Sequence, residues 1–271
     1  MAYGLLNGKR GIISGALDEN SIAWKIALKA KEEGATFTLT NAPIAMRMGA
    51  IKELAQHCNA EIIPADATSV EDLTNLFTQS AEILGGKTDF VLHSIGMSPN
   101  IRKGKPYTDL NYEWYKQSID ISAMSFHKMM QTAYKLDAIS EWGSVVALTY
   151  MAAQRTIPFY GDMADAKAVL ESIARGFGYH YGQYRNVRVN TVSQSPTPTK
   201  AGGGIDGFDL FYDFADKTAP LGNATAEQCA DYVVTLFSDL TRMVTMQNLF
   251  HDGGFSMTGI SEGVMALINK E

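Results

Sequence analysis

The feature that most constrains the fold is a regular alternation between short runs of strand-forming residues and longer amphipathic segments. Seven short apolar runs are predicted as strands, at residues 10–14, 35–40, 61–64, 89–93, 144–149, 187–192 and 247–250. Apolar residues recur at helical spacing in the segments between them, at residues 21–33, 46–57, 70–84, 112–136, 160–181 and 226–237. Such alternation predicts right-handed βαβ units. The expected fold is α/β, a Rossmann-like, doubly wound parallel sheet of about seven strands with helices on both faces.

The whole chain, residues 1–271, is predicted to form one dinucleotide-binding domain, because no linker, repeat or shift in composition divides it. One conspicuous break, at residues 193–207, contains two prolines and four glycines. It follows the sixth predicted strand, at the carboxyl end of the sheet, where ligands bind in such folds. We expect a flap over a substrate there. A plain surface loop is the alternative.

Charge and composition argue against several classes of protein. The net charge of −6 and the pI of about 5.4 disfavour a nucleic-acid binder, which is usually basic. Cys58 and Cys229 have no metal-ligand spacing and the five histidines are scattered, so the sequence predicts reduced thiols and no metal site. No stretch approaches the roughly 20 apolar residues of a membrane span, and the N-terminus lacks the apolar core of a signal peptide. We expect a cytoplasmic protein.

Tyr160 and Lys167 are the first candidates for chemistry, because a spacing of seven residues is two helical turns. On a shared face, a phenol can donate a hydrogen bond to a developing oxyanion. A neighbouring ammonium group can hold a cofactor and keep the local field positive. The alternative is a purely structural pair, in which a buried tyrosine lies beside a lysine whose stem covers apolar surface.

Several residues at predicted strand ends suit a dinucleotide. Gly15 follows the first strand, where glycine lets the backbone turn tightly beside a phosphate. Ser21 lies near the start of the first helix, whose N–H groups attract a pyrophosphate, although an N-cap role suits Ser21 equally. Asp66 and Ala67 follow the third strand, where a carboxylate can accept from an adenine amino group. A simple helix N-terminal aspartate is the alternative.

The segment His93-Ser94-Ile95-Gly96 follows the fourth predicted strand. Glycine at this point lets the ribose of a cofactor approach the backbone closely. His93 alone is expected to be a packed histidine rather than a base or a metal ligand.

Together these residues carry a family resemblance. They occur in the order Gly15…Ser21-Ile-Ala, Asp66, His93-Ser-Ile-Gly96, Tyr150…Arg155…Ile157-Pro158…Tyr160-x6-Lys167, Val187-Arg-Val-Asn190 and Asp252-Gly-Gly-Phe-Ser256. From Leu6 to about Met257 the chain closely resembles the NADH-dependent enoyl-acyl-carrier-protein reductases of bacterial fatty-acid synthesis, divergent members of the short-chain dehydrogenase/reductase superfamily. The Tyr-x6-Lys spacing, with a second tyrosine ten residues earlier, is its most specific part.

The resemblance implies a role for each part of the site. Tyr160 would hydrogen-bond the thioester carbonyl of a trans-2-enoyl substrate while hydride from NADH adds to the β-carbon. Lys167 would bind the nicotinamide ribose, and Tyr150 would sit beside the substrate as the third catalytic residue. The implied cofactor-binding residues are Gly15, Ser21, Ile22, Asp66, Ala67, Ser94, Ile95, Gly96, Lys167, Thr197 and Thr199. The implied substrate-binding residues are Met97, Ser98, Tyr150, Tyr160, Met163, Ile205 and Phe208, with a substrate-binding loop near residues 193–218.

Cofactor choice can be argued from charge. NADPH needs a cation for its extra phosphate. After the second predicted strand the chain reads Thr40-Asn-Ala-Pro-Ile-Ala-Met-Arg47, without an adjacent pair of basic residues. The sequence therefore predicts NADH in preference to NADPH, and Arg47 is the nearby cation that could reverse this.

The resemblance also implies partners. An acyl-carrier protein bearing an enoyl chain would be the substrate, and because that carrier is acidic a local basic patch that includes Lys200 is expected. A homotetramer is expected, with the late helix and the last strand at its interface. Two rival functions stay open: a ketone-reducing short-chain dehydrogenase, and a dinucleotide-binding sensor without turnover.

Overall fold

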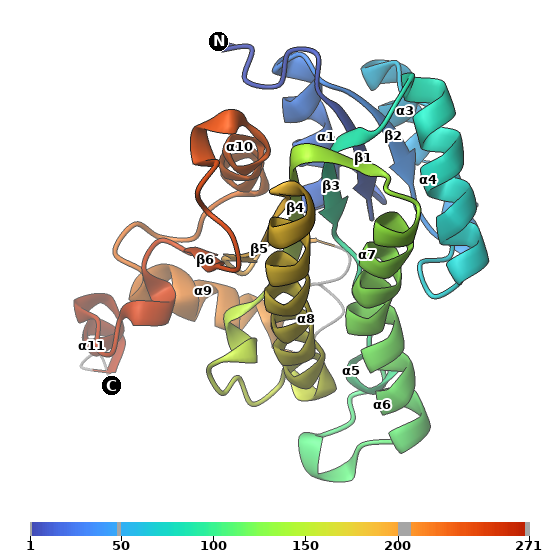
Figure 1. Cartoon of the computed structure of the whole chain (residues 1–271). Coiled ribbons are helices and arrows are strands. Elements are labelled where there is room, and N and C mark those ends of the chain that lie inside the picture. Colours follow the sequence, from blue (N-terminus) through green and yellow to red (C-terminus); the bar gives the residue numbers. More distant parts are fainter. Residues whose placement is uncertain (1, 48–49, 200–206, 269–271) are drawn as a thin grey trace.

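A parallel sheet forms the centre of the molecule (Figure 1), in a computed structural model that describes residues 2–47, 50–199 and 207–268. The strands are β1 (Arg10–Ser14), β2 (Thr36–Thr40), β3 (Thr88–His93), β4 (Ile139–Thr149), β5 (Arg188–Gln194) and β6 (Asn248–His251). Their order is β2-β1-β3-β4-β5-β6, and every neighbouring pair is parallel. The direction of strand addition reverses between β1 and β3, which makes the carboxyl end of these strands the expected ligand crevice.

Helices connect the strands. The α-helices are α1 (Ile22–Glu32), α2 (Pro43–Met46), α3 (Ile51–Cys58), α4 (Val70–Leu84), α5 (Pro99–Arg102), α6 (Tyr112–Ile119), α7 (Ser125–Lys135), α8 (Gly161–Arg185), α9 (Phe208–Thr218), α10 (Ala226–Phe237) and α11 (Glu262–Ile268). Short 3-10 segments lie at η1 (Tyr107–Asp109), η3 (Met151–Ala153), η5 (Asp239–Thr241) and η6 (Phe255–Met257), and a π-helical segment, η2 (Asp120–Met124), joins α6 to α7. Within the described residues, no helix is both long and apolar enough to cross a membrane.

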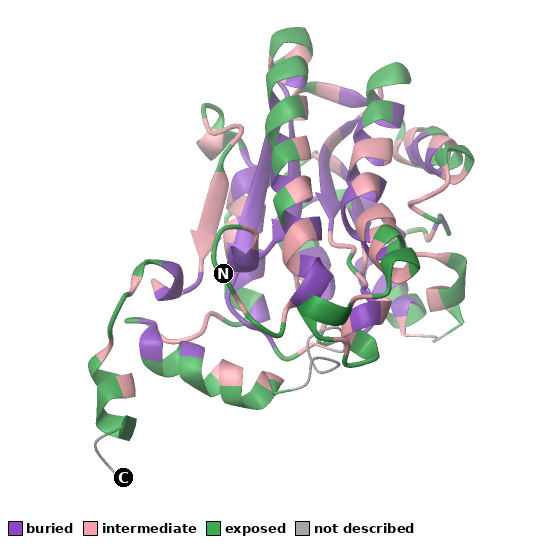
Figure 2. Cartoon of the chain, turned by 90° about the horizontal axis from the view of Figure 1, so that it is seen from below, coloured by how far each residue is buried: buried purple, intermediate pink, exposed green. Residues whose placement is uncertain are grey.

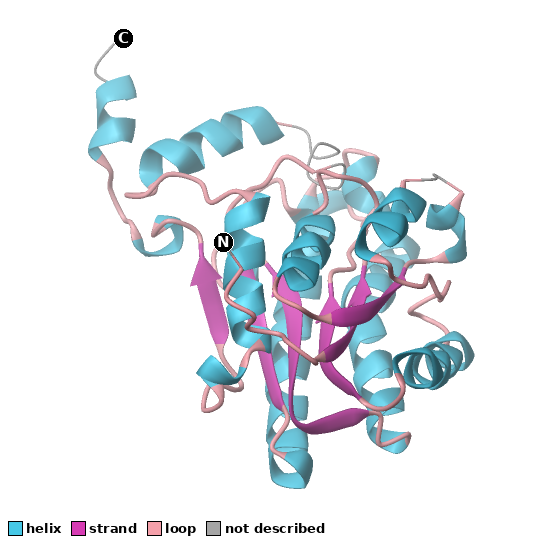
Figure 3. Ribbon diagram, turned by 90° about the horizontal axis from the view of Figure 1, so that it is seen from above, coloured by secondary structure: helices cyan, strands magenta, loops and turns pink. Residues whose placement is uncertain are grey.

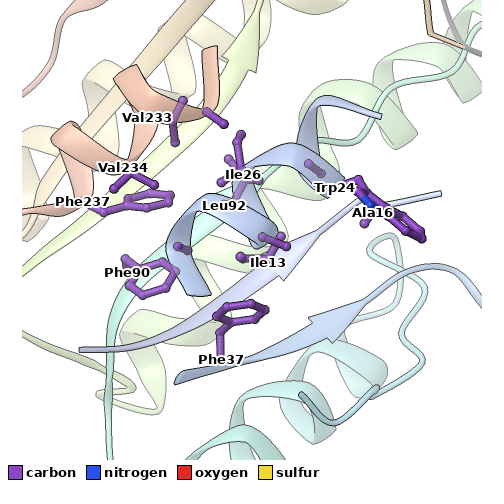
Figure 4. Packing of buried hydrophobic residues seen from close by; sticks show 14 of the residues in the cluster. Ile13, Ala16, Trp24, Ile26, Phe37, Phe90, Leu92, Val233, Val234 and Phe237 are labelled. Atoms are coloured by element: carbon purple, nitrogen blue, oxygen red, sulfur yellow. The ribbon is translucent and has the colours of Figure 1, made fainter. Parts of the chain in front are cut away.

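Helices lie on both faces of the sheet (Figure 3), and each face has its own apolar core. On one face the helices α1, α3 and α10 pack against the sheet, and Phe90 of β3 stacks on Phe237 of α10 with ring centroids 4.6 Å apart (Figure 4). On the other face α4, α7 and α8 bury residues such as Phe126 and Leu170. Helices on both faces confirm the predicted doubly wound architecture.

The sheet itself is the most buried part of the molecule, while the outer faces of the helices are exposed (Figure 2). All seven residues of β5 are buried, whereas all four residues of the edge strand β6 are half-buried. Central strands covered by helices on both sides are expected to lose nearly all contact with water.

Three predicted elements differ in detail. The segment 61–64 contributes a single parallel bridge, from Ile62 to Leu39, so the sheet of the described residues has six strands rather than about seven. The bonds to β2 are made by Glu61, Ile63 and Ala65, which pair with the backbones of Leu39 and Asn41. The helix predicted over 112–136 is interrupted by η2, and the helix predicted from Tyr160 begins one residue later and ends at Arg185.

The segment predicted as a flap lies at the carboxyl end of the sheet. Residues 195–199 follow β5 without regular structure, and α9 occupies Phe208–Thr218. Residues 200–206, which include the predicted Ile205 and Lys200, lie outside the described residues. Part of the predicted substrate-binding loop is therefore helical.

Candidate active site

Lys167 lies in the second turn of α8 and is only 8% exposed. Its Nζ donates a 2.8 Å hydrogen bond to the carbonyl oxygen of Leu148, near the end of β4. Burial lowers its pKa to about 8, and the charge of the nearby Glu171 opposes this shift. At neutral pH the ammonium form therefore still predominates, so the site holds a buried positive charge with one of its three donors already engaged.

Tyr160 immediately precedes α8, and the next residue, Gly161, has a left-handed φ of +46°. Tyr150 follows β4, two residues beyond the Leu148 carbonyl that accepts from Lys167. The Tyr150 and Tyr160 rings pack with centroids 4.9 Å apart. The predicted catalytic residues therefore meet at the carboxyl end of β4. The direction of the Tyr160 side chain is set by the turn at Gly161 and not by helical periodicity alone.

Both phenols are held in their neutral form. Desolvation raises the pKa of Tyr160 and of Tyr150 above the ordinary tyrosine value, and the neighbouring Tyr160 and Asp252 raise the pKa of Tyr150 further. Tyr150 is 8% exposed, and its Oη is buried without a hydrogen-bond partner among the described residues. A neutral phenol can donate to a carbonyl oxygen, which is the role predicted for Tyr160.

The predicted cofactor loop meets the first strand where the sheet order reverses. Gly15 has a φ of +89°, and a Cβ placed there would lie 1.9 Å from the Ser94 carbonyl oxygen. Only glycine fits this close approach. A Cβ at Gly96 would lie 3.8 Å from Lys167 Nζ and 3.3 Å from the Met163 methyl group. The structure therefore brings Gly15 and the Ser94-Ile95-Gly96 segment together, directly beside Lys167.

Ser21 is the N-cap residue of α1, but its side chain points back along the chain. Its hydroxyl accepts from the backbone N–H groups of Leu17 and Asp18, at 3.2 and 3.1 Å. These bonds close the turn between β1 and α1, so the hydroxyl shapes the turn rather than capping the helix. Ile22 follows as the first residue of α1.

Asp66 is exposed, and its Oδ1 accepts from both the backbone N–H and the hydroxyl of Thr68, at 2.8 and 2.7 Å. These contacts are those of a turn that leads into α4, as the alternative prediction stated. Ala67 is half-buried against the core of that face. The adenine role of Asp66 stays a prediction.

Buried polar atoms at the strand ends fit a dinucleotide. Among the described residues, Thr40 Oγ1 at the end of β2 and Ser193 Oγ near the end of β5 are buried without a hydrogen-bond partner. Such orphaned atoms are uncommon in native structures and need an explanation. A polar ligand lying along the carboxyl edge of the sheet would supply partners. Gly15 has no side chain that would keep such a ligand away from the backbone.

His93 is a packed histidine, as predicted. It is fully buried, its Nε2 lies 2.8 Å from Ser125 Oγ, and its ring packs on Phe126. Burial and the charge of Lys167 lower its pKa to about 3, so it stays neutral at physiological pH. The residues that the structure describes contain no group of three or more side chains that could hold a metal ion.

The remaining predicted residues of the loop lie after β5. Thr197 is 9% exposed, and its hydroxyl donates to the Ser195 carbonyl oxygen at 2.9 Å. Thr199 is half-buried. Phe208 begins α9, where its ring packs on Tyr212 with centroids 6.2 Å apart. Among the described residues, neither of these side-chain contacts reaches Tyr150 or Tyr160.

One side of the site, which we call the polar wall, is formed where α5 and α6 meet the start of α8. Its centre is Asp162, a fully buried residue that the sequence analysis did not single out. The carboxylate accepts from Ser98 Oγ at 2.6 Å, Asn100 Nδ2 at 2.8 Å and Ser118 Oγ at 2.8 Å. It lies in the first turn of α8, where the helix dipole favours an anion. The predicted substrate residue Ser98 is thus engaged with Asp162.

Ser122 continues the polar wall towards the cofactor loop. Its hydroxyl accepts from the backbone N–H of Met97 at 2.9 Å and lies 3.5 Å from the sulfur of Met163. Both methionines were predicted from the sequence, but Ser122 was not. Its position inside the π-helical segment η2, a kind of irregularity often found at functional sites, is the signal that structure adds.

The opposite side, which we call the aromatic wall, is formed by Tyr150, α9 and η6. Phe211 of α9 packs edge-on to Tyr150 with centroids 6.4 Å apart, and to Phe255 at 5.9 Å. A cavity of about 460 Å³ lies beside these rings, and Met151, Ile157, Phe214 and Phe255 contribute its apolar lining. Phe211 was not predicted. Its spacing of three residues from Phe208 and from Phe214 is the sequence signal that could have found it.

Comparison with known proteins gives one consistent result. The family model described as "Enoyl-(Acyl carrier protein) reductase" matches residues 15–256. "Enoyl-[acyl-carrier-protein] reductase [NADH] 2" from Rhizobium meliloti is 34% identical, covering 95% of both chains, and "Enoyl-[acyl-carrier-protein] reductase [NADH] FabI" from Rickettsia bellii is 36% identical, covering 96% of this chain and 98% of that one.

A solved structure supports the same family. The crystal structure of a FabI–NADH complex from Alistipes finegoldii is 62% identical, with a TM-score of 0.96, and the match covers 97% of this chain and 93% of that one. This agreement extends from the sheet to the helices that carry the site. The chain belongs to the enoyl-(acyl carrier protein) reductase family.

Proposed function

We propose that this protein reduces the trans-2 double bond of enoyl groups that acyl-carrier protein carries as thioesters, with NADH as the hydride donor. This is the last reductive step of the fatty-acid elongation cycle. The observation that carries the proposal is the meeting of Tyr160, Tyr150 and the buried Lys167 at the end of β4. The names of the relatives, which are NADH-dependent enoyl reductases, support it.

NADH, when bound, supplies the hydride for the β-carbon of the substrate. Gly15, Ser94, Ile95 and Gly96 are the residues that would hold it at the carboxyl edge, with Lys167 near its nicotinamide ribose. The orphaned hydroxyls of the strand ends support this placement. Arg47, which is exposed beyond α2, is the single basic residue of the segment 40–47 that follows β2, and this supports NADH over NADPH.

Tyr160 acts on the thioester carbonyl oxygen. Its phenol is neutral, because desolvation raises its pKa, and so it donates a hydrogen bond to that oxygen. As negative charge gathers on the oxygen in the transition state, this bond strengthens, which is how a positioned donor lowers a barrier. The charge of Lys167, buried and therefore weakly screened, favours the same enolate.

The acyl chain is apolar and needs an apolar surface. The aromatic wall offers one, because the rings of Tyr150, Phe211 and Phe255 pack against one another. Tyr150 contributes its ring to this surface and its hydroxyl to the substrate side of the site.

We extend the proposal to a single cytoplasmic domain that assembles as a homotetramer. Large apolar side chains exposed towards the C-terminus, namely Leu221, Met257 and Ile260, support an interface there, because each is at least 77% exposed. The half-buried edge strand β6 and helix α10 lie in the same part of the chain. Light scattering coupled to size-exclusion chromatography tests the assembly, and a monomer would refute it.

The activity itself is tested by following NADH oxidation with crotonyl and dodecenoyl thioesters. We expect turnover by the wild type, a large loss in Lys167→Ala and a smaller loss in Tyr160→Phe, which measures the share of the phenol. Turnover of a 3-oxoacyl thioester but not of an enoyl thioester would instead favour a ketone reductase. Tight dinucleotide binding without turnover of either thioester would favour a sensor.

A further inference from the structure

We propose that the acyl-carrier protein docks on the basic segment beside α5 and not on α9. We call the residues Arg102, Lys103 and Lys105 the α5 rim. The inference rests on the proposed function, since it assumes that the substrate is delivered on an acidic carrier. It goes beyond that function by assigning the surface that receives the carrier.

The α5 rim lies next to the catalytic tyrosine. Helix α5 begins directly after Ser98, and Ile101 Cγ1 lies 3.4 Å from the position that a Cβ on Gly161 would occupy. Gly161 is the residue that follows Tyr160, and Arg102 and Lys103 follow Ile101. Figure 1 shows the lower end of α8 with α5 and α6 on one side and α9 on the other. A partner seated on the rim is therefore close to Tyr160.

The rim is a local exception in an acidic chain. Residues 99–107 contain three basic side chains and no acidic one, although the whole chain carries a net charge of −6. Arg102 and Lys103 are exposed, and neither forms a salt bridge within the ranges that the structure describes. Lys105 pairs with Asp109 at 3.0 Å. Two unpaired cations remain to meet an acidic partner.

Helix α9 has the opposite charge. Asp209, Asp213 and Asp216 are all exposed on it, against the single basic residue Lys217. An acidic carrier that approached along α9 would be repelled, so the expected basic patch around the substrate loop is not found on this helix. The α5 rim and α9 thus carry charges of opposite sign, and this difference orients the carrier.

The rim is also held firmly in place. Ser98 and Asn100, which precede it, both donate to the buried carboxylate of Asp162, and Asn100 also bonds to the backbone of Asn111 at both ends of its amide. Docking on a pre-ordered surface costs less conformational entropy than docking on a loop that must be fixed first. Affinity then depends mainly on charge, and it falls as salt rises.

The test uses the double variant Arg102→Glu/Lys103→Glu in the full-length protein. Two substrates are compared: a crotonyl group on a bacterial acyl-carrier protein, and the same group on N-acetylcysteamine, which is uncharged and has no carrier. We expect the KM for the carrier-bound substrate to rise about tenfold or more, since charge reversal acts twice. The kcat/KM for the small thioester should not change. Adding salt should weaken carrier turnover by the wild type far more than by the variant.

Two single variants serve as matched controls. Lys135→Glu reverses an exposed charge at the end of α7. This helix leads into the start of β4, so Lys135 lies near the amino ends of the strands, away from the site. Lys217→Glu reverses the one cation of α9. Both should leave the KM for the carrier within about twofold. A larger effect from Lys217→Glu than from the rim variant would overturn the proposal.

A loss of turnover with the small thioester would mean that the reversed charges disturb the site itself. The milder Arg102→Gln/Lys103→Gln pair then decides, through the affinity of the carrier protein measured by titration calorimetry. A weaker affinity supports the rim, and an unchanged affinity refutes it. If the wild type reduces neither thioester, the proposed function fails, while the same titration still tests the docking surface.

Discussion

At the polar wall of the site, a buried carboxylate draws α5, α6 and α8 together through three hydrogen bonds of 2.6 to 2.8 Å. At the aromatic wall, by contrast, rings pack at centroid distances of 4.9 to 6.4 Å, and the hydroxyls of Tyr150 and Ser256 are buried without a partner among the described residues. The two walls lie on either side of the residues proposed to be catalytic, but they are held by different forces.

The difference assigns a task to each wall. Hydrogen bonds to a carboxylate are short and directional, so the polar wall fixes Tyr160 relative to the cofactor loop. Apolar contact is non-directional, so the aromatic wall can accept acyl chains that differ in length. The polar wall thus positions Tyr160, and the aromatic wall allows acyl chains of different length to bind.

The largest expected effect comes from breaking the polar wall. Asp162→Asn keeps the shape of the side chain but puts an amide where Asn100 offers its own amide donor, so one bond is lost. We expect kcat to fall by about 10- to 100-fold, because small misplacements of reacting groups are costly. The KM should change little, since Asp162 lies in the wall and not on the substrate.

Asp165→Asn is the matched control, because Asp165 lies one helical turn further along α8 and is only half-buried. Steady-state kinetics of both variants, and of Asp162→Asn combined with Ser98→Ala, test the idea. The double variant should lose little more activity than Asp162→Asn alone, because both changes break the same link. A variant that is less stable but has unchanged kcat would reduce Asp162 to a purely structural residue.

The next effect comes from opening the aromatic wall. Phe211→Ala removes the ring between Tyr150 and Phe255, next to the cavity lined by Phe214 and Phe255. We expect the ratio of kcat/KM for dodecenoyl over crotonyl thioester to rise about tenfold, a size typical of a changed apolar pocket. Tyr212→Ala, on the same helix but stacked only on Phe208 in the aromatic contacts described, should leave the ratio unchanged. Equal losses for both chain lengths would contradict the division of tasks.

The ionisation of Lys167 gives a prediction of pH dependence. Burial lowers its pKa from 10.5 to about 8, so between these values the unfolded state binds more protons than the folded state. The contribution of Lys167 to the free energy of unfolding therefore rises with pH through this window, by up to about 1 kcal/mol per pH unit. Burial also raises the pKa values of the Cys58 and Cys229 thiols, which opposes this rise from about pH 9. A Lys167 variant shares these thiols, and the buried tyrosines act only near pH 10 and above, so comparing the two proteins from pH 7.5 to 9.5 isolates Lys167.

Lys167→Met keeps the apolar stem and cannot titrate. Denaturant unfolding of both proteins across this range should give curves that diverge, because only the wild type gains the Lys167 contribution as pH rises. Parallel curves would show that Lys167 keeps an ordinary pKa in the folded state.

The smallest effect compares two buried tyrosine hydroxyls. Tyr181 Oη donates to the Met130 carbonyl oxygen at 3.1 Å, whereas Tyr150 Oη has no partner among the described residues. Tyr181→Phe should lower the free energy of unfolding by about 1 kcal/mol, and Tyr150→Phe should leave it unchanged or raise it slightly. Thermal unfolding of the ligand-free protein measures both. Equal destabilisation would mean that the Tyr150 hydroxyl is satisfied without substrate.

Much of the fold and part of the site could be predicted from the sequence. The alternation of strand-like and helical segments predicted the doubly wound sheet, because the period of apolar residues is a local property of the chain. One predicted strand, residues 61–64, forms only a single bridge to β2. Lys167, Tyr150, Tyr160 and Gly15 were found from spacing and from the family resemblance, and the structure brings them to one edge of the sheet.

Asp162, Ser122 and Phe211 were missed for a physical reason. An acidic residue in the first turn of a helix ordinarily faces water and complements the dipole, so nothing local distinguishes Asp162 from Asp165. Its burial depends on Ser98, which is 64 residues away in the chain. Ser98 was in turn expected to contact substrate, because its hydrogen-bond partner cannot be read from its neighbours.

The sequence by itself determined the layers of this protein, the glycine that lets β1 and β3 approach, and the tyrosine and lysine of the site. These depend on periodicity, backbone freedom and spacing, which are local. Only the tertiary structure decided which polar groups have hydrogen-bond partners, which wall is rigid and that the positive charge of the α5 rim lies beside the site. Those properties arise between segments far apart in the chain, where contact and burial, and not residue type, set the energy of each group.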